Sequence, residues 1–406
     1  MHLFLLIDDY LPSVKSAPLM FHQLANEFVQ QGHRVTLATP SATLQGKHYS
    51  IEENGQLKIF RFRAGALKNI GFVKRAIHET LLSYNLLTAI RAASDLGRPD
   101  LIISYSPTIF FGTALHILKH RYHCPVYIIL RDIFPQWCVD QGILSKYSPV
   151  YWYFKFFERL SYAAANAIGV EANGNLSYFS SQYRTQKRVH LLRNWFDCSS
   201  ALETGEGLRE KLHLQGKVIF FFGGNIGHAQ DMRNIVALAE KLKTTAPEAH
   251  ILLVGKGDEF DLVAQLCKEK SLQNITLLPA VPAKEYFQML SQIDIGLFSL
   301  HYNLQTSNIP GKLLGYMAYA KPILGSVNPG NDLLTLIPEY RAGLVSVNPD
   351  VETFAQDAMK LCTDEKFRKK CGDASRLLLE KEFSVPQIAK RIIDCVNHLN
   401  KKIDHF

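Results

Sequence analysis

Three segments in the second half of the chain combine glycine with residues that can bind phosphate. In Phe220–Gly227, three glycines and Asn225 end an apolar run, and Gly255–Gly257 also follows aliphatic residues. A strand that ends in glycines and opens into a helix lets backbone N–H groups approach a diphosphate, while the helix N-terminus adds partial positive charge. An ordinary tight turn before a helix is the alternative interpretation.

The third segment places a lysine where a helix should begin. Pro310 and Gly311 favour a helix start, so Lys312 falls in the first turn. A cation at that position opposes the helix dipole, which is unfavourable unless the lysine has another role. We expect Lys312 to bind a pyrophosphate and to stabilise the charge that develops on a leaving nucleotide. A solvated surface lysine is the alternative.

Signatures of other catalytic sites are absent from the sequence. It contains no D-x-D and no cluster of His, Cys and Asp with metal-ligand spacing, so it implies no divalent ion. It also lacks a GK[ST] loop, a G-x-S-x-G elbow and an H-E-x-x-H motif. We therefore expect a reaction that needs neither a metal nor another cofactor.

Polar side chains follow two apolar runs in the first half of the chain. Arg131 and Asp132 come after one run, and Glu171 and Asn173 come after the next. The carboxyl ends of parallel strands form the edge at which α/β proteins bind ligands. We expect Asp132 to contact a reactant there; a strand-end cap or an ion pair with Arg131 is the alternative.

The elements that must position these residues alternate between strand and helix. Short, continuous apolar runs indicate parallel strands covered on both faces, and the stretches between them have helical periodicity, as in Asp231–Lys243. This alternation predicts an α/β fold with doubly wound sheets. The expected strands are Leu3–Ile7, Val35–Ala38, Leu101–Ser104, Val126–Leu130, Ala167–Val170, Val218–Phe222, Ile251–Val254, Ile275–Leu278, Ile293–Phe298, Pro322–Leu324 and Leu344–Val347.

The alternation restarts once, which indicates two domains. A polar stretch with glycines, Arg193–Gly216, separates the two series, and 406 residues suit two α/β domains. We expect an N-terminal Rossmann-like domain over residues 1–196 and a C-terminal one over residues 197–385. Residues 386–406 should form a helix that starts at a proline and returns to the N-terminal domain.

Together these segments resemble the retaining GT-B glycosyltransferases of family four. That family has a glycine turn that opens the second domain, a VGxG strand end and a P-x-K-x-x-x-Y-M-A helix, which here spans Pro310–Ala318. Phe21–Thr39 is similar to the family's first helix and second strand. Arg131–Pro135 resembles an element of members that build bacterial surface polysaccharides. The combination of IDDYLP, RDIFPQW, GNIGHAQDM and PGKLLGYMA resembles the N-acetyl-L-fucosamine transferases of O-antigen assembly.

The resemblance implies two Rossmann-like domains facing a cleft and the transfer of a sugar from a UDP-sugar with retention of configuration. The acceptor would be an undecaprenyl-pyrophosphate-linked saccharide of O-antigen or capsule synthesis, bound to the first domain. The implied catalytic residues are Lys312, Asp132 and Asn225. Arg131, Glu171 and Asn173 would line the acceptor cleft. The donor would contact Gly224, Gly227, Gln230, Gly255, Gly257, Val281, Pro282, Ser307 and Asn308.

The sequence departs from the family pattern at two places. The E-x7-E motif, whose second Glu contacts the nucleotide ribose, is replaced by Ser307 and Gly315. The Arg and Lys that are common near the glycine turn are replaced by Asn225 and Gln230. Recognition of ribose and phosphate must therefore use other groups. His228 also follows the turn, where we favour a capping or solvent-exposed role over a catalytic one.

The excess positive charge lies entirely in the first half. Residues 1–200 hold 21 Lys and Arg against 13 Asp and Glu, whereas residues 201–406 hold 24 of each. A basic face attracts phosphate groups and anionic lipids. Leu67–Ile77 is both basic and apolar and could dock on a membrane, as could the aromatic Tyr147–Leu160. For the aromatic segment, core or interdomain packing is the alternative.

Three further features bear on location and on competing functions. The N-terminus reads as a buried strand instead of a signal peptide, and seven cysteines without C-x-x-C indicate reduced thiols. We therefore expect a cytoplasmic enzyme at the inner face of the plasma membrane. No RNA- or DNA-binding module is recognisable, which argues against a nucleic-acid partner. The alternatives are a GT-B nucleotide-sugar epimerase, with His and carboxylates around the sugar, and a sugar-nucleotide sensor without turnover.

Overall fold

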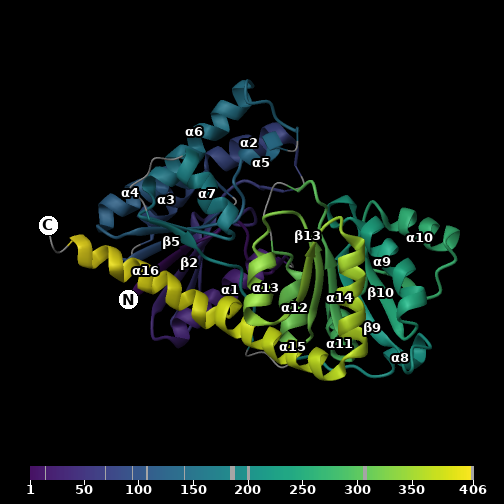
Figure 1. Cartoon of the computed structure of the whole chain (residues 1–406). Coiled ribbons are helices and arrows are strands. Elements are labelled where there is room, and N and C mark those ends of the chain that lie inside the picture. Colours follow the sequence, from purple (N-terminus) through teal and green to yellow (C-terminus); the bar gives the residue numbers. More distant parts are fainter. Residues whose placement is uncertain are drawn as a thin grey trace. The chain divides into compact units, whose positions relative to one another are not determined.

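The computed structural model divides the chain into two compact units, each with its own sheet (Figure 1). It describes residues 1–13, 15–68, 70–93, 95–106, 108–140, 142–182, 188–198, 202–304 and 309–403. The first unit comprises Met1–Glu171, Asn175–Arg193 and Val385–Phe406, and the second comprises Ala172–Gly174 and Asn194–Ser384. The chain crosses from the first unit to the second after Arg193, a few residues before the domain boundary expected at residue 197.

An eight-stranded sheet forms the centre of the first unit. Its strand order is β3-β4-β2-β1-β5-β6-β7-β8, and every neighbouring pair is parallel except β3 with β4. Strands β1, β5, β6 and β7 are buried along their whole length, which explains their continuous apolar sequences. The strands are β1 His2–Leu6, β2 Arg34–Ser41, β3 Tyr49–Asn54, β4 Leu57–Arg63, β5 Leu101–Ser106, β6 Val126–Leu130, β7 Ala167–Val170 and β8 Arg188–Leu191.

Helices connect these strands, and the C-terminal helix joins the same unit. This last helix, α16, begins at Val385, one residue before the expected proline start, and packs on α1 (Figure 1). Proline in the first turn removes no helical hydrogen bond. The helices are α1 Ser16–Gln30, α2 Phe72–Thr80, α3 Leu82–Ala92, α4 Gly112–Tyr122, α5 Gln136–Asp140, α6 Pro149–Ala164, α7 Asn173–Gln182 and α16 Val385–Ile403.

A six-stranded, wholly parallel sheet forms the centre of the second unit. Its order is β11-β10-β9-β12-β13-β14. Along β9 the side chains alternate between faces, so Phe221 joins one apolar cluster while Phe220 and Phe222 join the other. The strands are β9 Val218–Asn225, β10 Ala249–Lys256, β11 Ile275–Pro279, β12 Ile295–Ser299, β13 Ile323–Val327 and β14 Gly343–Val347.

Both sheets reverse their strand order once, in the first unit between β1 and β5 and in the second between β9 and β12. Ligands of doubly wound proteins bind at such a point, outside the carboxyl ends of the strands. The predicted α/β, doubly wound fold is confirmed. The helices of the second unit are α8 Leu208–Lys211, α9 Met232–Thr245, α10 Phe260–Glu269, α11 Ala283–Gln292, α12 Lys312–Ala318, α13 Leu333–Tyr340, α14 Val351–Thr363 and α15 Glu365–Leu378, with a π-helical turn at Leu379–Phe383.

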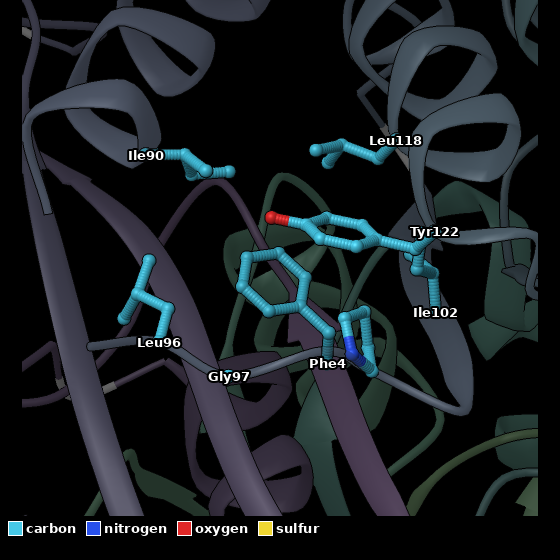
Figure 2. A pocket seen from close by; sticks show the side chains of 8 residues that line it. Phe4, Ile90, Leu96, Gly97, Ile102, Leu118 and Tyr122 are labelled. Carbon is cyan, nitrogen blue, oxygen red and sulfur yellow. The ribbon is translucent and has the colours of Figure 1, made fainter. Parts of the chain in front are cut away.

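A hollow in the core of the first unit is too small for a substrate. Apolar side chains that include Phe4, Ile90 and Leu118 line it together with the ring of Tyr122 (Figure 2). Its volume is about 10 Å³, roughly the space that one water molecule needs.

Candidate functional site

The glycine turn lies in the middle of the carboxyl edge of the second sheet. Strand β9 ends in Gly223, Gly224 and Asn225 and pairs with β10 on one side and β12 on the other. Gly224 has φ +117°, which side chains other than glycine rarely adopt. A Cβ atom at Gly255 would lie 1.8 Å from the Gly224 carbonyl oxygen. Glycine at both positions therefore allows the two strand ends to meet, with Gly224 and Asn225 left exposed.

Two further predicted donor residues serve close packing of the loops. A Cβ atom at Gly257 would lie 2.0 Å from the carbonyl oxygen of Ile226, and one at Gly227 would lie 2.3 Å from Oδ1 of Asp258. The loop after β9 and the loop after β10 are thus in contact. Gly227 and Gly255 are buried, whereas Gly224 and Gly257 are exposed and accessible to a ligand.

Lys312 opens α12, as predicted, and its ammonium group is buried beside the turn. The Nζ atom lies 3.2 Å from the centroid of the Phe222 ring. Among the residues that the structure describes, Nζ has no hydrogen-bond partner. Burial holds the pKa of Lys312 well below its usual range. The Phe222 ring offsets part of the free-energy cost of burying the ammonium group, and a bound anion would offset more of that cost.

The turn and this lysine are close enough to share a ligand. A Cβ atom at Gly224 would lie 3.9 Å from Nζ of Lys312. Asn225 and Gln230 stand beside them, and the Asn225 side-chain amide donates to Oε1 of Gln230 at 2.8 Å. The structure thus brings together the predicted residues Gly224, Asn225, Gln230 and Lys312. They form an exposed turn above a buried cation.

The helix predicted to follow the glycine turn, Asp231–Lys243, is present as α9, and Asp231 is its N-cap residue. A 3-10 turn, His228–Gln230, intervenes before α9. Asp231 caps α9, accepting from the Asn234 N–H at 3.4 Å, and it also accepts from the Asn348 side-chain amide at 2.8 Å. The N-terminus of α9 is therefore already satisfied by a carboxylate of the chain itself.

Sequence reasoning missed two residues at this edge, Glu259 and His301. The ring of His301 lies 4.5 Å from that of His228, and Nδ1 of His228 lies 3.4 Å from Oε1 of Glu259. Glu259 follows β10 and His301 follows β12, the two neighbours of β9. Both residues come just after apolar runs in the sequence. Residues in such positions meet at the carboxyl edge of a parallel sheet, so the sequence could have indicated them.

The remaining predicted donor residues lie elsewhere. Val281 and Pro282 follow β11, which is separated from β9 by β10. Val281 is half-buried and packs against the core, whereas Pro282 is exposed at the start of α11. Ser307 and Asn308 lie outside the described residues.

In the first unit, three predicted residues gather at the ends of β6 and β7. The Arg131 guanidinium donates to the carbonyl oxygens of Leu192 at 2.7 Å and Arg193 at 3.1 Å. Burial raises the pKa values of Asp132 and Glu171, and the positive charge of Arg131 opposes that rise. Arg131, Asp132 and Glu171 therefore form one electrostatically coupled group at the ligand-binding edge of this sheet.

Asn173 is engaged separately from this group. Residues Ala172–Gly174 belong to the second compact unit. The Asn173 backbone N–H and side-chain amide both donate to Oδ2 of Asp332, at 3.0 Å and 3.1 Å. Its predicted contact with an acceptor stays a prediction.

A pocket of about 460 Å³ lies near the end of β1 in the first unit, lined by Asp9, Ser13, Lys15, Lys68 and Arg75. Lys68 forms an ion pair with Asp9, and the Lys15 Nζ lies 3.8 Å from the same carboxylate. The neighbouring ammonium group of Lys68 lowers the pKa of Lys15. Two cations thus compete for one carboxylate, an arrangement that a multiply charged anion would stabilise.

Both segments predicted to dock on a membrane carry exposed apolar side chains. Phe72 on α2 is 91% exposed, and Trp152 and Phe156 on α6 are 55% and 61% exposed. The two helices touch through a hydrogen bond between the hydroxyl groups of Thr80 and Tyr153. The exposed aromatic side chains lie outside the core, but Phe154 and Phe157 of α6 pack against it and Tyr151 is buried. Core packing therefore explains part of the aromatic segment.

The described residues hold neither a membrane-spanning helix nor a cluster of metal ligands. None of their helices combines the length and the apolar character needed to cross a membrane. None of their His, Cys, Asp and Glu side chains come together in a group of three that could hold a metal ion. The seven cysteines are free thiols.

Comparisons with known proteins place this geometry in a family. Residues 19–195 match the family model "Glycosyl transferase 4-like domain", and residues 206–378 match "Glycosyl transferases group 1". The chain is 21% identical over 316 residues to "Probable glycosyltransferase WbjE" of Pseudomonas aeruginosa, covering 77% of this chain and 78% of the relative. It is 21% identical over 412 residues to "Putative colanic acid biosynthesis glycosyl transferase WcaI" of Escherichia coli K12, covering 98% and 97%.

A solved structure agrees with these matches in fold. Anabaena HepE in complex with UDP superposes with a TM-score of 0.66 at 14% identity, covering 98% of this chain and 100% of that one. The two family models cover most of both units, and the fold is the one expected from the sequence. The chain is therefore a glycosyltransferase of the GT-B fold, with a 4-like domain followed by a group 1 domain.

Proposed function

We propose that this glycosyltransferase moves a sugar from a UDP-sugar donor to a lipid-linked saccharide, with retention of configuration and without a metal ion. The observation that carries the proposal is the buried ammonium group of Lys312, without a partner in the described chain, beside the exposed turn at Gly224 and Asn225. A nucleoside diphosphate bound at the turn would supply the missing anion. The UDP in the HepE structure supports this class of donor.

Lys312 would act on the leaving group. Negative charge grows on the departing phosphate as its bond to the sugar breaks, so a preplaced cation stabilises the transition state more than the ground state. The departing phosphate would accept the proton of the attacking hydroxyl. The protein then has to supply positioning and charge stabilisation more than a strong base. Asn225 would add a polar contact at the same turn.

The acceptor would bind the first unit. Arg131, Asp132 and Glu171 offer hydrogen-bonding and charged groups for a saccharide. The pocket lined by Lys15 and Lys68 suits the diphosphate of an undecaprenyl-pyrophosphate-linked acceptor. Asp132 would contact the reacting end of the acceptor.

The transferred sugar would be N-acetyl-L-fucosamine, and the product would be part of a surface polysaccharide such as O-antigen or capsule. The sequence resemblance to N-acetyl-L-fucosamine transferases supports the sugar. The name of the relative WcaI, which refers to colanic acid biosynthesis, supports the polysaccharide class. An epimerase of the same fold is not favoured, because both matching family models describe glycosyl transferases.

The enzyme would work at the cytoplasmic face of the plasma membrane as a peripheral protein. Phe72, Trp152 and Phe156 are exposed aromatic groups that can enter the lipid interface. The positive charge of the first half would attract anionic lipids. Co-sedimentation with anionic vesicles at low salt checks this proposal, and absence of binding would contradict it.

A donor panel tests the proposed reaction. Purified enzyme is incubated with UDP-N-acetyl-L-fucosamine or other UDP-sugars and a short prenyl-pyrophosphate-linked saccharide, and products are identified by mass spectrometry. We expect one UDP-sugar to add a single sugar to the acceptor, and Lys312→Ala to lower that rate at least a hundredfold. Activity of the variant within threefold of the parent would exclude the leaving-group role. An isomerised nucleotide sugar without extended acceptor would support the epimerase.

A second experiment tests the acceptor pocket. Lys68→Ala should raise the KM for the prenyl-pyrophosphate acceptor about tenfold and leave the KM for the donor unchanged, because one charged contact is lost. Lys74→Ala is the matched control, since it removes an exposed lysine of α2 that does not line the pocket. Equal effects of both substitutions would indicate general attraction to the membrane and contradict a diphosphate pocket.

A further inference from the structure

Glu259 is a carboxylate at the edge of the second sheet, and one of its oxygens has no partner among the residues that the structure describes. Its side chain is 15% exposed, and Oε1 faces Nδ1 of His228 at 3.4 Å. Oε2 is buried, and no described residue donates a hydrogen bond to it. The residue stands at the N-cap of α10 but makes no capping hydrogen bond. A buried carboxylate oxygen in this state is costly, which indicates that it is retained for a ligand with hydroxyl or N–H donors.

The strand order places Glu259 beside the middle of a nucleotide bound at this edge. The diphosphate would lie at Gly224, after β9, and the base near Val281, after β11. Strand β10, which Glu259 follows, lies between these two strands. The ribose links the base to the diphosphate, so it must pass the end of β10. The backbone N–H of Glu259 also donates to the carbonyl oxygen of Ile226 at 3.1 Å, which ties this residue to the glycine turn.

The chemistry of ribose fits a carboxylate at this position. Two neighbouring hydroxyl groups can donate to the oxygens of one carboxylate, and in doubly wound folds an acidic residue after the second strand often binds ribose hydroxyls. Strands β9 and β10 are the first and second strands of this unit. Gly315 offers no carboxylate, and it is packed in the core, where a Cβ atom would lie 3.1 Å from Cδ1 of Leu290. Glu259 therefore offers a carboxylate at the strand end that the ribose must pass.

We propose that Glu259 binds the ribose hydroxyls of the nucleotide and that His228 holds its carboxylate in position. The inference rests on the proposed UDP-sugar donor and adds the group that selects a ribonucleotide. It assigns no covalent step to either residue. Glu259 is thus a specificity-determining residue for the nucleotide, and His228 is a positioning residue.

Binding of UDP and of 2′-deoxy-UDP, measured by titration calorimetry, tests this role. We expect the parent to bind UDP at least tenfold more tightly than 2′-deoxy-UDP, because one charge-assisted hydrogen bond is lost. Glu259→Gln should reduce that preference to threefold or less. Asp261→Asn is the matched control, since it makes the same change of charge in the first turn of α10 at an exposed position, and it should keep the full preference.

The possible results separate this inference from the proposed function. If the parent binds UDP but does not prefer it to 2′-deoxy-UDP, or if Glu259→Gln keeps the full preference, the ribose role is wrong. If the parent binds neither nucleotide, the proposed donor itself is wrong, and the ribose role is overturned with it. The ratio of the two affinities is the decisive quantity, because a purely structural effect of the substitution would weaken both ligands equally.

Discussion

Replacing Lys312 by methionine should stabilise the folded protein while it slows sugar transfer. Methionine has a similar length and fills the same apolar space against Phe222 without a charge. The Lys312 ammonium group is buried without a hydrogen-bond partner in the described chain, so the free protein carries its desolvation cost. After the loss of the cation–π contact, we expect the variant to gain about 2 kcal/mol in the free energy of unfolding at pH 7.

The pH dependence of this gain follows from the lowered pKa of Lys312. Between that pKa and the ordinary lysine value, the unfolded chain binds one proton more than the folded chain. The stability of the parent should therefore rise with pH in this window, by up to about 1.4 kcal/mol per pH unit from this group. The methionine variant lacks this contribution, so its advantage should shrink as the pH rises from 7 to 9.

The activity should change in the opposite direction. Removal of one preorganised group that stabilises a developing negative charge typically costs about 100-fold to 1,000-fold in kcat. We expect Lys312→Met to fall in this range with a modest change in the KM for the acceptor. Urea unfolding at pH 7 and pH 9 and steady-state transfer assays measure the two effects on the same preparations.

Lys321 provides the matched control for this prediction. Burial also lowers its pKa, but its Nζ donates to the carbonyl oxygens of Ser291 at 3.2 Å and Ile293 at 2.7 Å. Lys321→Met should therefore destabilise the protein by about 1–3 kcal/mol, because it leaves both oxygens without this donor. If Lys312→Met destabilises the protein to the same extent, or if its stability follows the same pH profile as the parent, the account of an unpaired ammonium group is refuted.

Three further predictions follow from the same geometry. Binding of UDP at pH 8 should be accompanied by uptake of up to about one proton, because the diphosphate favours the charged form of Lys312. Calorimetry in two buffers of different ionisation enthalpy checks this, and equal heats of binding in the two buffers would contradict it. Gly255→Ala should weaken UDP binding at least tenfold, since the Cβ atom of the alanine would lie 1.8 Å from the Gly224 carbonyl oxygen. Unchanged affinity for UDP in a titration would contradict this and show that the turn can shift freely. Burial lowers the pKa of His250 to about 4, so the unfolded chain binds a proton at a higher pH than the folded chain does. The parent should therefore lose about 2 kcal/mol in the free energy of unfolding between pH 6.5 and pH 4. His250→Gln should not show this loss, and identical acid unfolding profiles of parent and variant would refute the role of His250.

Most of the strands that could be predicted from the sequence are buried along their length, although the half-buried edge strands β11 and β14 were predicted from their apolar sequences as well. Strands β1, β6 and β12 are continuous apolar runs, because helices cover both sides of their sheets. Strand β3 escaped prediction, since it lies at the edge of the first sheet and exposes Glu52 and Glu53. The short edge strand β8 was missed for a related reason, because four residues that begin with Arg188 give no clear apolar run.

The candidate site could be predicted only in part. The position of Lys312 follows from the helix start at Gly311, which local sequence indicates well. The proximity of His228, Glu259 and His301 depends on the order of β10, β9 and β12 in the sheet, and apolar periodicity does not specify that order. The 3-10 turn before α9 was missed because its three residues, His228–Gln230, are too few to show helical periodicity in the sequence.

The most direct test of the central claim follows the fate of the donor sugar in the presence of excess EDTA. The enzyme, a UDP-sugar selected from the donor panel and the prenyl-pyrophosphate-linked acceptor are combined, and UDP and acceptor mass are measured in the same sample. The account predicts that UDP is released in equal amount to acceptor that has gained one sugar, with no loss of rate in EDTA. Loss of transfer in EDTA that returns with a divalent cation, or consumption of donor without any heavier acceptor, would contradict it.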